Sequence, residues 1–527
     1  MATGRVRTTL PFLLLLGTLL FAGAVASSRE RGEQQREQGR HEWRGEESEE
    51  REQQQEQEEF SRRKPYMFGR RSFRRAARSE HGTIRSLRPF HEASQLLRGI
   101  RDYRVTVLEA SPRAFVLPAH ADAHSIGYVV QGEGVVTTIE NGERRSYTVR
   151  QGSVFVAPAG AVTYLANTDG RRKLVVAKLL RTISVPGHYQ FFFGAGGRNP
   201  ESVVSSFSRT VQRAAFKTST DRLQKLFGRQ DKGVIVRATE QQVRDLQRHA
   251  SEGGHAQQHW PFGEARGPIN ILDQRPTIGN RHGQLYEADA RSFRDLAEHD
   301  VRVSLVNITA GSMSAPFYNT RSIKIAYVVD GEGHAEIVCP HLAQQQQHGS
   351  ETQREGRRRS REREQESQDK SKQWRRRRQE GSESESEEEE QKYETIRARL
   401  TRGTLFVVPV GHPVVEVASR DSNLQIVCFE VQAQRNERVY LAGQDSVLRK
   451  LDGAAKELAF QAAQREVDEV LRAQQDKGFL QGPEQESQER RREGEEEEEE
   501  EEEERERGRR GRREEVAEML LRMATEG

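Results

Sequence analysis

The fold is decided by the heptapeptide Tyr128-Val129-Val130-Gln131-Gly132-Glu133-Gly134, which returns in the same chain as Tyr327-Val328-Val329-Asp330-Gly331-Glu332-Gly333. A second stretch, Gly152-Ser153-Val154-Phe155-Val156-Ala157-Pro158-Ala159-Gly160, returns as Gly403-Thr404-Leu405-Phe406-Val407-Val408-Pro409-Val410-Gly411. The two offsets are 199 and 251 residues, and a charged segment between Gln344 and Gln391 accounts for most of the difference. The sequence therefore predicts two copies of one module, with an insertion in one loop of the second copy.

Each copy has the pattern of a β-barrel. The segments between turn residues are short and rich in β-branched residues, which is typical of strands. In the first copy they are 104–108, 114–117, 126–130, 135–139, 146–149, 154–157 and 174–180. Asn141-Gly142 separates two of them and predicts a tight hairpin, because both residues tolerate positive φ. Many short strands at this spacing favour an antiparallel jelly-roll barrel.

Helices are predicted after each barrel. In the second copy, apolar residues recur at helical spacing between Ala455 and Leu471 and form one stripe. In the first copy, Leu223, Leu226 and Phe227 precede a segment in which Thr239 and Gln242 have the spacing of a capping box. The predicted fold class is mainly β, with two tandem modules each followed by α-helices.

The first residues predict entry into the secretory pathway. Arg5 and Arg7 precede an apolar run from Leu10 to Val25, and Ala24-Val25-Ala26 is a small-x-small cleavage pattern. The run is interrupted and too short to favour an uncleaved membrane anchor. Removal of residues 1–26 takes away two arginines and no acid, so the net charge falls from +3 to +1. A net charge near zero favours association.

Composition identifies segments that cannot form a core. The chain has 527 residues, of which 34% are hydrophobic and 31% charged, and 13 of its 84 basic residues are Lys, so that 71 are Arg. Charge is densest in Arg29–Glu59, Gln344–Gln391 and about Glu484–Arg513, and we expect these segments to be disordered. Their Arg runs stand among Glu runs of similar size. We therefore predict no nucleic-acid partner, and no membrane partner after signal cleavage.

The repeated motifs resemble those of the bicupins, and within them the vicilins, the 7S seed storage globulins. Gly152, Pro158, Gly160, Thr163 and Asn167 fit the spacing of the second cupin motif. Gly403, Pro409, Gly411 and His412-Pro413 look like the vicilin form of that motif, and Tyr440-Leu441-Ala442-Gly443 is also vicilin-like. The resemblance covers roughly residues 62–480 and is closest to the cereal embryo and aleurone type.

The resemblance implies a seed storage protein, a reserve of nitrogen and carbon that is degraded at germination. It implies a homotrimer joined through the terminal helices, transport to protein storage vacuoles or protein bodies, cleavage of the charged loops by processing proteases, and allergenicity as a property to test. Arg carries three side-chain nitrogens and Gln one, so a composition rich in both fits a nitrogen store. Two cysteines, Cys339 and Cys428, allow at most one disulfide.

The predicted organisation divides the chain into six parts. They are a signal peptide (1–26), a disordered arm rich in Arg, Glu and Gln (27–61), the first cupin module with its helices (62–250), a linker (251–268), the second cupin module (269–480, with the low-complexity insertion 344–391) and a Glu-rich disordered tail (481–527).

Metal-dependent cupin enzymes share this fold, and their barrel metal is held by two or three His with a carboxylate. In the first copy the matching residues are His120, Asp122 and His124, but Thr163 stands at the second-motif His and Ser125 at the carboxylate position. In the second copy Phe317-Tyr318-Asn319 and Val414 replace the ligands. We therefore predict that the protein is not an enzyme and has no catalytic residues.

A different metal site is implied by the resemblance. Some vicilins bind copper through a Cys-x-His pair, a His after Gly, and a Tyr from the N-terminal arm, and the matching residues are Cys339, His341, His412 and Tyr66. Thiolate and imidazole together suit copper, or zinc as the second choice. The alternative is that Cys339 packs as a small apolar residue or bridges to Cys428, and that His412 only hydrogen-bonds within its loop.

A second function also stays open. Some vicilin-like proteins resemble sugar binders, and the mouth of a barrel can hold a small ligand. The alternative to storage alone is therefore a protein that binds a sugar or a small carboxylate.

Overall fold

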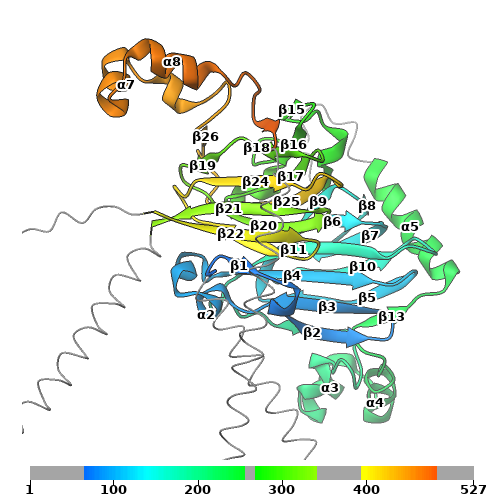
Figure 1. The fold of residues 1–527 in the computed structure, drawn as a ribbon. Coiled ribbons are helices and arrows are strands. Elements are labelled where there is room, and N and C mark those ends of the chain that lie inside the picture. The colour runs from blue at the N-terminus through cyan, green and yellow to red at the C-terminus, as the bar shows by residue number, and fades with distance from the viewer. Residues whose placement is uncertain (1–63, 256–266, 341–392, 484–527) are drawn as a thin grey trace, which may run out of the picture. The chain divides into compact units, whose positions relative to one another are not determined.

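The computed structural model describes residues 64–255, 267–340 and 393–483 (Figure 1). These residues form two compact units, the first made mainly of residues up to 254 and the second mainly of residues from 255 onward. The predicted signal peptide, N-terminal arm, charged insertion and nearly all of the Glu-rich tail lie outside the described residues. None of the described helices is long and apolar enough to cross a membrane.

The first unit contains two antiparallel sheets. One includes the strand run β9-β6-β11-β4-β3-β2, and the other has the order β12-β5-β10-β7-β8, with β13 (Ile235–Arg237) added to β5. The strands of the first run are β2 (Phe73–Ser79), β3 (Gly82–Leu87), β4 (Tyr103–Ala110), β6 (Ala123–Gln131), β9 (Ser153–Ala157) and β11 (Leu174–Thr182). Those of the second are β5 (Ala114–Ala121), β7 (Glu133–Glu140), β8 (Glu143–Arg150), β10 (Val162–Asn167) and β12 (Phe191–Phe192). Two short strands, β1 (Met67–Phe68) and β14 (Ile269–Asn270), flank this part of the chain.

The second unit repeats this arrangement. One sheet includes the run β23-β20-β25-β17-β16-β15, and the other has the order β22-β21-β24-β18-β27, with β19 pairing both β24 and β26. The strands of the first run are β15 (Ile278–Asn280), β16 (Gly283–Ala288), β17 (Val301–Ile308), β20 (Ile323–Asp330), β23 (Leu405–Val408) and β25 (Leu424–Val431). The others are β18 (Ser312–Ser314), β19 (Phe317–Asn319), β21 (Glu332–Cys339), β22 (Glu394–Thr401), β24 (Val414–Ala418), β26 (Arg438–Tyr440) and β27 (Phe479–Gln481). The prediction of two β-barrel modules is confirmed.

One hairpin explains the unequal offsets of the repeat. In the first unit β7 and β8 are joined by Asn141 and Gly142, both with positive φ (52° and 81°), as their side chains predicted. In the second unit the equivalent strands are β21 and β22, which pair along their whole length from Glu332↔Thr401 to Cys339↔Glu394. The charged insertion therefore replaces a two-residue turn and leaves the hairpin beneath it intact.

The helices follow the barrels as predicted, with one correction. The first unit has α2 (Phe90–Ala93), α3 (Arg209–Phe216), α4 (Thr220–Phe227) and α5 (Glu240–His255), and the second has α7 (Gly453–Phe460) and α8 (Gln464–Arg472). The apolar stripe from Ala455 to Leu471 is divided between α7 and α8, because Gln461 adopts a left-handed conformation (φ 52°) that ends α7.

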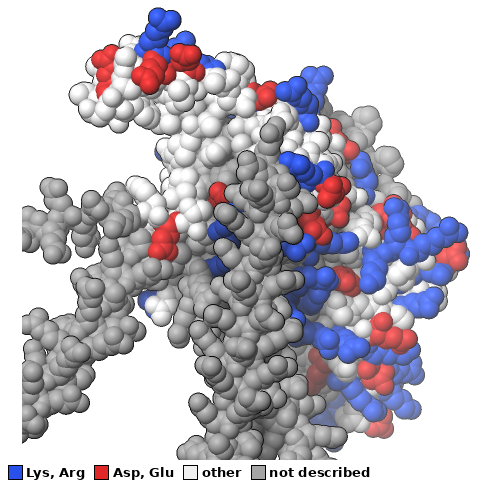
Figure 2. All heavy atoms as spheres, in the orientation of Figure 1, with Lys and Arg blue, Asp and Glu red and all other residues white. Residues whose placement is uncertain are grey.

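The predicted capping box at the start of α5 is confirmed. The backbone N–H of Thr239 donates to Oε1 of Gln242 (2.9 Å), and the N–H of Gln242 donates to Oγ1 of Thr239 (3.2 Å). Each residue thus satisfies a backbone donor of the other at the helix start. Over the visible surface, acidic and basic side chains are interspersed (Figure 2), and many of them pair, as Arg244 does with Glu240 at 2.7 Å.

Candidate functional site

The structure brings Cys339 and His412 to neighbouring positions in the second unit. Cys339 ends β21, and His412 lies in the turn between β23 and β24. Ile337 pairs with Val414, and the N–H of Val338 donates to the carbonyl of Pro413 (2.9 Å). Continuing this antiparallel register by one residue places Cys339 opposite His412. The strand pairing thus brings two residues 73 positions apart in the chain to the same end of the β21–β24 pair.

Both residues are buried, and their surroundings fit a metal as well as a structural role. Cys339 is fully buried and His412 is 6% exposed. Nδ1 of His412 lies 3.0 Å from the carbonyl oxygen of Val410, and a ligating histidine is usually oriented by a backbone carbonyl at its other ring nitrogen. Cys339 and Cys428 are both free thiols, so the predicted alternative of a disulfide between them is not realised.

The structure does not test the other two predicted ligands. His341 lies outside the described residues, and Tyr66, which is 1% exposed, belongs to the first unit. Within the described residues no group of three or more His, Cys, Asp and Glu side chains is placed to hold a metal ion. A third His, Cys, Asp or Glu ligand beside Cys339 and His412 would therefore have to come from outside the described residues, where the predicted ligand His341 lies.

The residues of the first barrel that match cupin enzyme ligands have structural partners. The ring of His120 stacks on Phe192, with centroids 5.0 Å apart. Oδ1 of Asp122 accepts from the N–H of Gln190 (2.7 Å), and Nδ1 of His124 accepts from the N–H of Ala159 (3.2 Å). Each of these three side chains thus holds a loop or a neighbouring strand, and they do not converge on one point.

A buried charged cluster in the second barrel was missed by sequence reasoning. Lys324 on β20 is 2% exposed and Glu416 on β24 is 1% exposed, and Nζ of Lys324 donates to Oε1 of Glu416. The ammonium also lies 5.1 Å from the ring centre of Phe317 and 6.0 Å from that of Phe406. Burial lowers the pKa of Lys324, but the acidic groups Cys428 and Glu416 outweigh it, so the pKa lies above its ordinary value.

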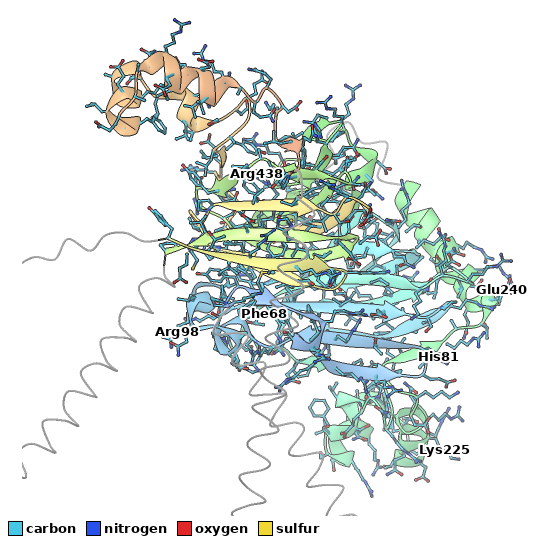
Figure 3. All side chains as sticks on the ribbon, viewed as in Figure 1. Phe68, His81, Arg98, Lys225, Glu240 and Arg438 are labelled. Carbon is cyan, nitrogen blue, oxygen red and sulfur yellow. The ribbon has the colours of Figure 1, made fainter. Side chains whose placement is uncertain are left out.

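A second ion-pair group lies beside it. Arg438 (Figure 3) donates to Glu430 (2.8 Å) and to Glu287 (3.2 Å), and Arg302 lies 3.3 Å from the other oxygen of Glu430. Burial alone would raise the pKa of Glu430, but Arg438 and Arg302 outweigh it and the pKa is lowered. All these charges are compensated within the protein. A lysine within the otherwise apolar run Ile323–Val329 was the sequence signal that could have revealed the cluster.

The first barrel contains an interior lysine without such compensation. Lys178 on β11 is intermediate in exposure. Among the described residues no hydrogen bond or ion pair reaches its ammonium, and desolvation lowers its pKa to about 8. The hydroxyl of Ser125 on the adjacent strand β6 is also buried and has no hydrogen-bond partner in the described structure. A desolvated ammonium, together with a buried hydroxyl without a partner on the next strand, favours an anionic ligand.

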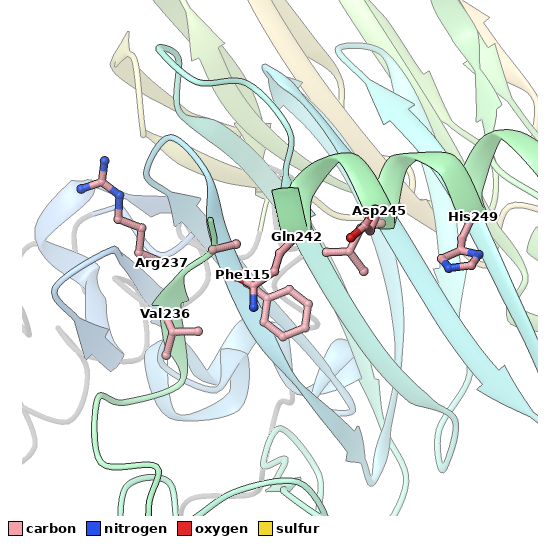
Figure 4. Close-up of a pocket in the computed structure, with 8 residues that line it drawn as sticks. Phe115, Val236, Arg237, Gln242, Asp245 and His249 are labelled. Carbon is pink, nitrogen blue, oxygen red and sulfur yellow. The ribbon is translucent and has the colours of Figure 1, made fainter. Parts of the chain in front are cut away.

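An open groove of about 390 Å³ is present where α5 passes over β5 and β13 (Figure 4). Its lining combines the apolar side chains of Phe115, Val236 and Leu246 with the polar side chains of Arg237, Asp245 and His249. The charges of both signs around this groove give it no preference for one ligand class.

Comparison with known proteins places the chain in a well-defined group. A family described as cupin matches residues 79–182 and 269–468. The maize (Zea mays) protein "Globulin-1 S allele" is 65% identical over 488 residues, which cover 88% of this chain and 82% of the maize protein. The solved structure of hazelnut vicilin (Corylus avellana) is similar with a TM-score of 0.66 and 36% identity, covering 80% of this chain and all of that chain.

A further solved structure adds a finding about ligands. The vicilin of Solanum melongena is similar with a TM-score of 0.67 and 31% identity, covering 80% of this chain and 98% of that chain. The crystal structure of that vicilin revealed different anionic ligands in structurally similar pockets.

Proposed function

The chain belongs to the cupin family and, within it, to the vicilin-like seed storage globulins, and on that premise we propose that it serves as a store of nitrogen and carbon with no catalytic activity of its own. The observation that carries the proposal is the similarity to the maize globulin along 88% of the chain. Composition supports it, because the chain carries 71 arginines, and those in the charged segments supply nitrogen without being needed for a folded core. The engagement of His120, Asp122 and His124 in structural contacts supports the absence of cupin enzyme chemistry.

We propose that the protein is deposited in protein storage vacuoles and is later degraded there by proteases. This proposal rests on the sequence of the first 26 residues and on the charged segments, which have too little apolar surface to form a core. Limited digestion of the native protein with a low dose of trypsin tests it. We expect cuts first within Arg29–Glu59 and Gln344–Gln391, with the two barrels left intact, because proteases need extended and exposed chain. Resistance of both segments would contradict the proposal.

We also propose a homotrimer formed through the helical hairpins that follow each barrel. The hairpin α3–α4 exposes Val211 (51%) and Leu226 (63%), and the hairpin α7–α8 exposes Leu458 (74%) and Val470 (70%). Large apolar side chains gathered on two exposed hairpins are typical of surfaces that associate. Processing proteases acting on the charged segments are the other proposed partners.

The residues Cys339, His341 and His412 are proposed to bind copper, or zinc as the second choice. The burial of the Cys339 thiol and the His412 imidazole at the same end of the β21–β24 pair supports this, and both metals accept sulfur and nitrogen ligands together. A bound metal would supply a structural cross-link between the β21 end and the β23–β24 turn. The contribution of Tyr66 stays a prediction from the sequence.

Elemental mass spectrometry of the native protein tests the metal proposal. We expect about one metal ion per chain, lost in the variant Cys339→Ala/His341→Ala and kept in Cys428→Ala, which removes the other buried thiol. Absence of metal from the native protein, or its retention in the double variant, would rule the site out.

The second candidate function is binding of a small carboxylate in the first barrel. The uncompensated ammonium of Lys178 favours it, and so do the anionic ligands found in the Solanum melongena vicilin. Titration calorimetry with sodium acetate at pH 7 tests it. We expect saturable binding by the native protein and none by Lys178→Met. Equal heats for the two proteins would show that this barrel does not select carboxylates.

A further inference from the structure

Three equivalent positions distinguish the interiors of the two barrels. Lys324 on β20 corresponds to Ser125 on β6, because the flanking repeat has the offset of 199 residues. Cys428 on β25 corresponds to Lys178 on β11, since Cys428 pairs with Ser304 as Lys178 pairs with Thr106 on the equivalent strands. Each barrel therefore carries one lysine at these two equivalent positions. In the second barrel the lysine is Lys324 on β20, and in the first barrel it is Lys178 on β11.

The third position decides whether that lysine has a counter-ion. Glu416 on β24 pairs across the sheet with Ala335, and the equivalent residue Leu165 on β10 pairs with Val136. In the second barrel the three positions are thus Lys, Glu and Cys, and in the first they are Ser, Leu and Lys. The first barrel therefore has a lysine but no carboxylate at the equivalent position, because Leu165 stands where Glu416 neutralises the lysine of the second barrel.

The geometry around Glu416 is that of a bound carboxylate. Its side chain accepts from Lys324, its backbone N–H donates to Oγ of Ser314 (3.0 Å), and it is 1% exposed. The aromatic rings of Phe317 and Phe406 face the ammonium of Lys324 from within 6.0 Å. A small carboxylate entering this barrel would find its cation already neutralised, and would have to displace a paired and desolvated group of the protein.

We infer that Glu416 is a resident carboxylate that closes the second barrel to anions, so that each chain takes small monocarboxylates only in the first barrel, beside Lys178 and Ser125. This inference rests on the proposed carboxylate binding for the first barrel. Glu416 lies in the second barrel, so its role can be tested in a protein whose first barrel no longer binds a carboxylate.

The test measures acetate binding and thermal unfolding of the full chain in the background Lys178→Met, which lacks the first-barrel cation. This background is expected to bind no acetate. Adding Glu416→Ala removes the carboxylate and leaves space beside Lys324, and we expect about one acetate per chain to bind and to raise Tm by several degrees at about a hundred times Kd. Adding Glu416→Asp instead keeps the carboxylate and is expected to leave acetate without effect.

A second variant guards against misfolding of the Ala protein, because an unpaired buried lysine is destabilising. The pair Lys324→Met/Glu416→Leu removes both charges and should fold without any response to acetate. If Glu416→Ala folds and neither binds acetate nor gains thermal stability from it, the inference is wrong. It is also wrong if Glu416→Ala folds no better in acetate than in chloride while Lys324→Met/Glu416→Leu folds normally. Failure of the unmodified protein to bind acetate would instead remove the first-barrel function.

Discussion

Single residues decide what each barrel interior can hold. Lys178 and Lys324 lie on neighbouring strands of the repeated barrel, and within the described part of the chain only Lys324 of the two has a carboxylate beside it. Burial of an ammonium without a partner opposes its charged form, whereas a paired ammonium keeps its charge. The same side chain therefore acts as a structural ion in one barrel and as a candidate ligand-binding group in the other.

The first prediction concerns the stability of the empty first barrel. Replacing Lys178 by Met removes a desolvated cation and keeps an unbranched side chain of similar length, so we expect the free energy of unfolding at pH 7 to rise by about 1–4 kcal/mol. Urea unfolding without added anions checks this. An unchanged or lower stability of Lys178→Met would show that the ammonium is compensated in solution.

The pH dependence of that difference is the second prediction. The pKa of Lys178 is about 8 in the folded protein, below the value of roughly 10.4 in an unfolded chain. Between these values the unfolded chain binds a proton that the folded chain does not, so stability of the native protein rises with pH. The advantage of Lys178→Met should shrink from pH 7 to pH 10.5. Acetate binding should weaken above about pH 8, because the amine becomes neutral.

Some of these residue roles were accessible from the sequence and others were not. The absence of a complete His and carboxylate set at His120, Asp122 and His124 followed from motif spacing. The pair of Lys324 and Glu416 did not, because 92 residues separate them and only strand pairing brings them together. Equivalence between Lys178 and Cys428 becomes visible only when the registers of both barrels are known.

Secondary-structure elements show how the repeat accommodates its differences. The hairpin β7–β8 closes with Asn141 and Gly142, while β21–β22 carries the charged insertion and keeps a full pairing register up to Cys339↔Glu394. The turn chemistry of Asn-Gly was readable directly from the sequence. The break between α7 and α8 was not, because Gln461 interrupts the helix without a Gly or Pro to signal it.

The third prediction follows from the intact hairpin under the insertion. Replacing residues 340–393 by Asn-Gly should give a chain that folds with both barrels, since the strands already pair up to that point. Shortening the loop also lowers the entropy of closure, by up to about 3 kcal/mol for this change in length. Thermal unfolding should therefore show no loss of stability, while any metal bound by His341 is lost. A markedly lower Tm would mean that the insertion supports the barrel.

The fourth prediction concerns the helical hairpins. The double variant Leu458→Lys/Val470→Lys places two charges among the exposed apolar side chains of α7 and α8, and we expect it to be monomeric by size-exclusion chromatography with light scattering. The matched control is Glu469→Lys, an exposed site next to Val470 that lies on another face of α8. A trimer in the double variant, or a monomer in the control, would contradict the assignment of the α7–α8 surface.

At the scale of the whole molecule, the two barrels and the charged segments contribute to storage in different ways. The two barrels supply a stable and repeated core, and the charged segments supply Arg, Glu and Gln that are not needed for that core. Architecture was predictable because a repeat with ordered motifs is a strong signal, and the cupin family matches both copies. The assembly of the units and the state of the metal site were not, because they depend on contacts that a single sequence does not display.

The measurement that tests storage most directly is the amount of this chain in seeds through development and germination, by quantitative mass spectrometry of its peptides. The account predicts accumulation during seed filling, early loss of intact peptides from residues 344–391 on imbibition, and later disappearance of barrel peptides such as those around Tyr128 and Tyr327 as seedling nitrogen demand rises. A constant amount of intact chain through germination, while total seed protein falls, would contradict it.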